Sequence, residues 1–224
     1  MQIRNIMDLF VVIDKLYHYL AGTDICFDKD GFPIFRQEMF LDEWPELIIP
    51  FSQRKNRRVT NKKKTVLCFF DKDHHLYPRL RKVMDEIEEY KQFMGVVGID
   101  VTVTDDMDQE WQRAILLLNQ LFLAVLAVNG VKIILNTRTG GQSASDVFRN
   151  MPAGTMAASG FLGCNNLAAE DDFTYLEKIL VLLPEKLIIY GKHDSVAEHQ
   201  LDAMGINYRV YKDFHRLCKE VHHG

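Results

Sequence analysis

The chain alternates short β-branched apolar runs with amphipathic helical patterns from residue 65 onward. Apolar runs of this length predict strands at 65–70, 96–102, 131–136, 155–159, 186–190 and 208–211. Helical patterns lie between and after them, at 76–92, 107–128, 144–150, 172–183, 195–204 and 213–221. Such alternation predicts right-handed βαβ units. We therefore expect an α/β fold with about six βα units forming a parallel sheet, either open and doubly wound or an incomplete TIM-like barrel.

The first sixty residues carry a different pattern. Apolar residues at helical spacing between 4 and 21 predict an amphipathic helix that Gly22 ends. The segment 26–49 has a turn signal at 28–31 and several prolines, which is typical of irregular structure wrapping a domain. We therefore predict an N-terminal helical extension and wrapping segment with a basic loop (1–60), followed by a parallel α/β domain (61–224).

Composition narrows the class of protein. The 224 residues are 47% hydrophobic, enough for a buried core, and the formal net charge of -4 gives no global attraction to nucleic acid or anionic lipid. No Cys-x-x-Cys motif is present, which is typical of free thiols in a reducing compartment. The cysteines are Cys26, Cys68, Cys164 and Cys218.

No membrane segment is expected. Asp8 and Asp14 interrupt the apolar run near the start of the chain. The longest apolar segment, 114–128, contains Asn119 and Gln120 and is typical of a buried crossover helix. We predict a cytoplasmic protein without a membrane partner, and the sequence indicates neither a cofactor nor an oligomeric state.

A block of positive charge precedes the first strand of the α/β domain. It contains seven basic residues and no acid: Arg54, Lys55, Arg57, Arg58, Lys62, Lys63 and Lys64. Charge blocks of this kind are often solvated loops. The alternative is a nucleic-acid arm, in which the last five of these residues would contact phosphates and binding would weaken with salt.

Polar residues cluster where the predicted strands end. In a parallel sheet these ends meet at one edge, where α/β proteins bind ligands. The candidate ligand-binding residues are Asp100, Asn136, Arg138, Ser159 and Lys192, and the candidate catalytic residues are Asp71, Asp100 and His193. Asp100 lies within a β-branched run, where an acid is costly unless it is paired or functional.

Other polar residues at this edge have a simpler explanation. Asp105, Asp106, Asp194 and Ser195 precede predicted helices and are typical N-cap residues. The segment 71–75, Asp-Lys-Asp-His-His, is similar to the Asp-His-His motif of metal phosphoesterases. Those enzymes need further aspartates on other strands, which the sequence does not supply, so an ordinary strand-to-helix turn is the alternative.

Six blocks give the chain a family resemblance. They are Ile-Pro-Phe-Ser at 49–52, Thr-Val-Leu-Cys-Phe-Phe-Asp at 65–71, Gly-Ile-Asp at 98–100, Asp-Met with Gln109 at 106–109, Asn-Gly-Val-Lys-Ile-Ile at 129–134 and Pro-Glu-Lys-Leu-Ile-Ile-Tyr-Gly-Lys at 184–192. In these blocks and their order the chain resembles the DUF4417 family of phages, prophages and conjugative elements of Gram-positive bacteria. The chain departs from it at Leu118-Asn119-Gln120, where the family has Arg-Asn-Arg. The resemblance implies a cytoplasmic protein of a mobile element and brings no activity.

Three functions are compatible with these patterns. The first is a non-structural mobile-element accessory protein that binds a phosphorylated ligand, nucleotide or nucleic acid, at the strand-end cleft. The second is a metal-assisted hydrolase or lyase. The third is a module that inhibits a host protein complex by contact, with aromatic anchors at Phe32, Phe35, Phe40 and Trp44. Those aromatic side chains can equally cover the domain's own core.

Overall fold

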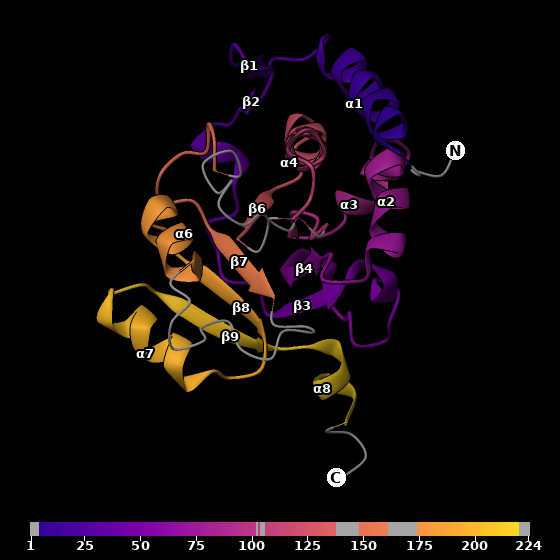
Figure 1. Cartoon of the computed structure of the whole chain (residues 1–224). Coiled ribbons are helices and arrows are strands. Elements are labelled where there is room, and N and C mark those ends of the chain that lie inside the picture. The colour runs from indigo at the N-terminus through magenta and orange to yellow at the C-terminus, as the bar shows by residue number, and fades with distance from the viewer. Residues whose placement is uncertain (1–4, 102, 104–105, 138–147, 161–173, 220–224) are drawn as a thin grey trace.

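Seven parallel strands form one sheet in which strand order follows chain order (Figure 1). The computed structural model describes residues 5–101, 103, 106–137, 148–160 and 174–219, of which 174–177 without their side chains. The strands are β3 (Leu47–Pro50), β4 (Thr65–Cys68), β5 (Gly95–Val97), β6 (Ile133–Asn136), β7 (Ala157–Gly160), β8 (Leu187–Gly191) and β9 (Tyr208–Lys212). Right-handed crossovers in unbroken order place every connecting helix on one face of the sheet, so the sheet curls instead of being doubly wound.

Helices follow the strands and cover the outer face (Figure 1). They are α2 (Asp73–Lys82), the 3-10 turn η4 (Val83–Glu86), α3 (Ile87–Tyr90), α4 (Gln109–Val128), α6 (Thr174–Leu182) and α7 (Ser195–Ala203). Helix α8 (Phe214–Lys219) follows β9 and stands away from the sheet (Figure 1). Asp108 caps α4 by accepting hydrogen bonds from the amides of Glu110 and Trp111. Asp194 caps α7 as predicted, whereas the predicted cap of α4 at Asp106 is wrong and Asp105 lies outside the described residues.

Alternate residues of the strands belong to two separate hydrophobic cores. The outer-face residues, such as Leu67, Val96 and Leu187, pack with the helices. The inner-face residues pack on one another and on residues that include Leu41 and Trp44; they are Ile48, Val66, Cys68, Phe70, Val97, Ile134, Met156, Ala158, Ile188 and Tyr190. A sheet whose inner face forms its own core is nearly a closed barrel, with one seam left between β9 and β3.

Side chains bridge this seam without a strand ladder. The Tyr211 hydroxyl of β9 donates to the carbonyl of Pro45 at 2.9 Å, just before β3. The Arg209 guanidinium lies 4.7 Å from the centre of the Trp44 ring. The predicted α/β fold is therefore confirmed, and of its two forms the incomplete TIM-like barrel is the one observed.

The N-terminal segment packs against the outer layer. Helix α1 (Ile6–Leu20) packs against α4 and lies beside it in Figure 1, and the predicted helix is confirmed. The short strands β1 (Cys26–Phe27) and β2 (Pro33–Ile34) form a hairpin across the predicted turn. The 3-10 turns η1 (Gln37–Met39), η2 (Phe51–Gln53) and η3 (Lys62–Lys64) complete the described elements up to β4.

One strand of the sheet was not expected from the sequence. The six predicted strands correspond to β4 through β9, but β3 begins at the end of the segment 26–49, which we predicted to be irregular. Its run Leu-Ile-Ile-Pro is only four residues long and ends in Pro50. A proline is tolerated there because β3 is an edge strand with one paired neighbour, β4.

Candidate functional site

The carboxyl edge of the sheet brings two of the predicted ligand-binding residues together. Asp100 follows β5 and Asn136 ends β6, and the Asn136 Nδ2 donates to the Asp100 Oδ1 at 3.1 Å. Asn136 is almost fully buried and shares the inner sheet face with Ile134 by alternation. Asp100, whose carboxylate would be costly without a partner in a β-branched run, therefore has one at the end of the neighbouring strand.

The other predicted residues of this edge are spread around it. Ser159 is fully buried and shares a short hydrogen bond with the Thr137 hydroxyl, so it joins β6 to β7. His193 is exposed, and its Nδ1 lies 3.0 Å from the Glu198 Oε1 at the start of α7. Lys192 is half-buried after β8, and Arg138 lies outside the described residues.

A cavity of about 720 Å³ opens at the carboxyl ends of β3 and β4, beside the start of α2. Five of its lining residues are acidic, basic or histidine residues, and we call the site that they define the α2 cleft: Arg54, Asp71, His74, His75 and Arg79. The other lining residues are Pro50, Phe51, Ser52, Gln53, Cys68, Phe69, Leu76 and Pro78. Of the predicted catalytic residues, Asp71 is the one that lines this cavity.

Two arginines share the aromatic ring of Phe51 in this cleft. The guanidinium carbon of Arg54 lies 4.1 Å from the ring centre, and that of Arg79 lies 5.4 Å from it. Arg54 also donates to the Phe51 carbonyl at 3.1 Å, and its Nε lies 3.4 Å from the Glu89 Oε1. Arg79 pairs with Glu86, which accepts a hydrogen bond from Tyr90 at 3.0 Å. These contacts fix both guanidinium groups in place.

The acidic and thiol groups of the cleft have shifted pKa values. Burial alone would raise the pKa of Asp71, but hydrogen bonds from His75 and from the Lys72 amide lower it below its usual value. The His75 Nδ1 lies 3.0 Å from the Asp71 Oδ1. Burial raises the pKa of Cys68 to about 12, so this thiol stays protonated at neutral pH and is a poor nucleophile.

The start of α2 adds a further feature suited to anions. His74 and His75 lie in its first turn, and the N-cap residue Lys72 forms no side-chain cap. Amide groups at an uncapped helix start, together with the helix dipole, favour negatively charged ligands. His75 and Arg79 are four residues apart, so they lie on the same face of α2. Arg79 was missed from the sequence, and this spacing after the strand end is the signal that could have indicated it.

The predicted nucleic-acid arm does not gather at this cleft. The three lysines of η3 lie directly before β4, at the amino edge of the sheet, and are engaged there. Lys62 donates to Gln92 at 2.6 Å, and Lys63 donates to the Lys91 carbonyl at 2.8 Å. Lys64 lies 3.6 Å from Glu43. Arg57 and Arg58 follow η2 in the connection between the two edges.

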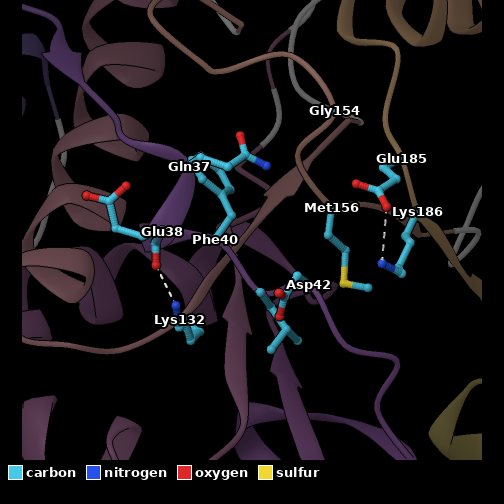
Figure 2. A pocket seen from close by; sticks show the side chains of 10 residues that line it. Gln37, Glu38, Phe40, Asp42, Lys132, Gly154, Met156, Glu185 and Lys186 are labelled. Atoms are coloured by element: carbon cyan, nitrogen blue, oxygen red, sulfur yellow. Dashed lines mark hydrogen bonds and ion pairs between the residues drawn. The ribbon is translucent and has the colours of Figure 1, made fainter.

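The amino edge has its own cavity, of about 550 Å³. Figure 2 shows Glu38 and Lys132 on one side of it and Glu185 and Lys186 on the other, with Met156 between them. Lys132 donates to the Glu38 carbonyl, and the Lys186 Nζ lies 3.6 Å from the Glu185 Oε1. Both lysines of this cavity thus have partners in the protein itself. In barrels of this kind the amino edge serves stability and the carboxyl edge serves function.

The alternative functions find less support in the described part of the chain. There, no group of three or more His, Cys, Asp or Glu side chains could hold a metal ion. Phe32, Phe35 and Phe40 are buried in the protein itself, and Trp44 packs against the inner core.

Helix α4 is long and apolar enough to cross a membrane, but 72% of its apolar window is buried, as in the core helix of a soluble protein.

The comparisons with known proteins give a family and no activity. No curated protein and no solved structure matches the chain. One family model, described as a domain of unknown function, matches residues 30–211, which span the sheet from β3 nearly to the end of β9. Since the match covers most of the chain, the chain belongs to the DUF4417 family.

Proposed function

We propose that the protein binds a phosphorylated ligand, a nucleotide or a nucleic-acid phosphate, in the α2 cleft at the carboxyl edge of the sheet. The observation that carries the proposal is the pair of arginines, Arg54 and Arg79, fixed in one cavity beside an uncapped helix start. Guanidinium groups donate planar, charge-assisted hydrogen bonds that match phosphate oxygens. Helix amides at the same place add to this attraction.

The volume of the cleft and the ion pairs of its two arginines support this ligand class. A cavity of about 720 Å³ lies within the usual size range of small-molecule sites. Glu86 and Glu89 hold the arginines without lining the cavity, so the ligand does not have to order two long side chains itself. Preorganisation of this kind lowers the entropic cost of binding.

The biological setting is part of the same proposal. The resemblance described above implies a cytoplasmic accessory protein of a phage, prophage or other mobile element. Arg57 and Arg58 lie between the two edges of the sheet and would extend the positive surface away from Arg54 for a longer ligand such as a nucleic acid. The hydrolase and host-inhibitor alternatives stay predictions, because no contact among the described residues favours either.

Arg54→Gln and Arg79→Gln are each expected to weaken binding of a phosphate-bearing ligand. Inorganic phosphate, ATP and a short single-stranded RNA serve as probes, with affinity measured by calorimetry at about 50 mM and about 200 mM salt. Loss of one charge-assisted hydrogen bond corresponds to a decrease of about 10-fold or more in affinity. Binding of the RNA is expected to fall more steeply with salt than binding of phosphate, because more counterions are released.

Arg81→Gln is the matched control, because Arg81 lies on the same helix but does not line the cavity. The triple change of Lys62, Lys63 and Lys64 to Ala tests the amino-edge lysines and is expected to leave phosphate and ATP binding unchanged. The proposal is wrong if no probe binds at the lower salt concentration, or if Arg81→Gln weakens binding as much as Arg54→Gln does.

A further inference from the structure

A second, much smaller cavity lies under the carboxyl ends of β5 and β6, against α4. Its volume is about 20 Å³, and its lining residues include Gly98, Leu123, Asn119, Gln120 and Asn136. No charged side chain is among its lining residues. The absence of a side chain on Gly98 is part of what leaves the space open, since a Cβ there would lie 3.5 Å from the Leu123 Cδ1 and 3.6 Å from the Asn136 Cβ.

Asn119 presents an unusual polar group to this cavity. Its residue exposure is 8%, and both Nδ2 and Oδ1 are buried without a hydrogen-bond partner among the described residues. A buried amide that satisfies neither its donor nor its acceptor destabilises the folded state, because both groups have lost their hydrogen bonds to water. Such groups are rare in folded proteins and usually indicate a bound water or ligand.

We propose that this cavity binds one water molecule, held by the Asn119 amide. The volume decides the class of occupant, because one water needs about 10–15 Å³ of such space and a phosphate or nucleotide needs far more. The neutral lining likewise favours a neutral occupant over an anion or a metal ion. Water both donates and accepts, so it meets the needs of Oδ1 and Nδ2 and has bonds left for the neighbouring amides.

The water joins helix α4 to the strand ends. Asn136 lines the same cavity and donates to Asp100 at 3.1 Å. The water therefore lies between Asn119 of the helix and the ends of the two strands from which Asp100 and Asn136 extend. Asn119 holds the water in this arrangement, and it is separate from the arginines of the α2 cleft.

Gly98→Ala tests the proposal by whether it raises or lowers the melting temperature. Gly98 lines the cavity, and the new methyl group makes only ordinary contacts, so it takes up part of the cavity's space. In a dry cavity it would raise the melting temperature by about 1–4 °C, because glycine replacement reduces the entropy of the unfolded chain. If it displaces a bound water, it leaves the Asn119 amide unsatisfied, and we expect a decrease of about 2–8 °C. Gly22→Ala, at a site with open space around it, is the control.

Direct detection of the water completes the test. Nuclear Overhauser effects between water and the Asn119 side-chain amide protons are expected in the wild-type protein. Asn119→Leu, which keeps the approximate size of the side chain, is expected to abolish the water contact seen from the Gly98 amide proton. Absence of a long-lived water at Asn119 in the wild-type protein, or a melting temperature raised by Gly98→Ala, overturns the proposal.

Discussion

Replacing Gly160 with alanine is expected to lower the melting temperature by about 6–12 °C, which corresponds to overpacking of about 3 kcal/mol in a domain of this size. A Cβ at Gly160 would lie 2.4 Å from the Phe70 Cδ1 and 2.6 Å from its Cγ. The Phe70 ring cannot simply move away, because it also stacks on Tyr190 at 5.5 Å between ring centres, and both rings are buried in the inner core. Thermal unfolding followed by circular dichroism measures the effect.

A double mutant separates this clash from a general effect of losing the glycine. Phe70→Leu shortens the side chain, so Gly160→Ala is expected to cost much less in the Phe70→Leu background than in the wild type, a coupling typical of residues in contact. Gly22→Ala again serves as the control, with no atom within 4 Å of the added Cβ. Equal costs of Gly160→Ala in both backgrounds would show that the close approach of Phe70 is not the cause.

Asp28→Asn is expected to destabilise the protein by about 1–3 kcal/mol at neutral pH. The Asp28 Oδ1 accepts from the amides of Asp30 and Phe32, both at 2.9 Å, and its Oδ2 accepts from Arg149 at 2.6 Å and Asn150 at 2.9 Å. An asparagine Nδ2 in place of Oδ2 is itself a donor, so it could not accept the hydrogen bonds of Arg149 and Asn150. Urea unfolding followed by fluorescence measures the change.

The pH dependence of this effect has a definite sign. Burial would raise the pKa of Asp28, but the hydrogen bonds from Asn150, from the Phe32 and Asp30 amides and from Arg149 lower it to about 2. A carboxyl group whose pKa is lower in the folded state stabilises the protein above its unfolded pKa near 3.8 and loses that contribution as the pH falls toward 2. The difference between wild type and Asp28→Asn is therefore expected to shrink over this range.

Asp24→Asn is the matched control for this prediction. Asp24 also pairs with an arginine, Arg36, at 2.8 Å, but its side chain is 69% exposed. Exposed pairs of this kind contribute about 0–1 kcal/mol, so this variant is expected to be nearly as stable as the wild type at every pH. A loss of stability in Asp24→Asn as large as that in Asp28→Asn would contradict the role given to the hydrogen bonds at the hairpin.

Periodicity was enough to predict the parallel sheet but not its curvature. Strands β4 to β8 are buried on both faces, and β4, β6 and β8 read as mostly apolar runs without alternation. The sequence of a strand with two apolar faces does not show whether its second face packs on helices or on the other strands of the same curled sheet. That choice follows from strand order, which depends on pairing between distant segments. Strand β3 was missed for a local reason, since four residues ending in a proline give too short a signal.

The strand-end rule identified part of the candidate site. It predicted that Asp100 and Asn136 lie close together, and it included Asp71. It did not indicate Arg79, which reaches the cleft from within α2, and it could not show that Asn119 is left without a partner, because hydrogen bonding inside a core depends on packing. Lys62 precedes the predicted strand at 65–70. The sequence alone could therefore have indicated that it lies at the amino edge of the sheet.

The strand order also has a consequence for how the chain folds. Each strand pairs with the next one along the chain, so every ladder of the sheet joins segments that leave the ribosome one after the other. The seam is different, because the bond from Tyr211 to Pro45 spans 166 residues. Contacts of such long range carry the largest loop-closure cost and form late. Growth from β3 toward β9 can therefore proceed step by step during synthesis, and closure of the seam is its final event.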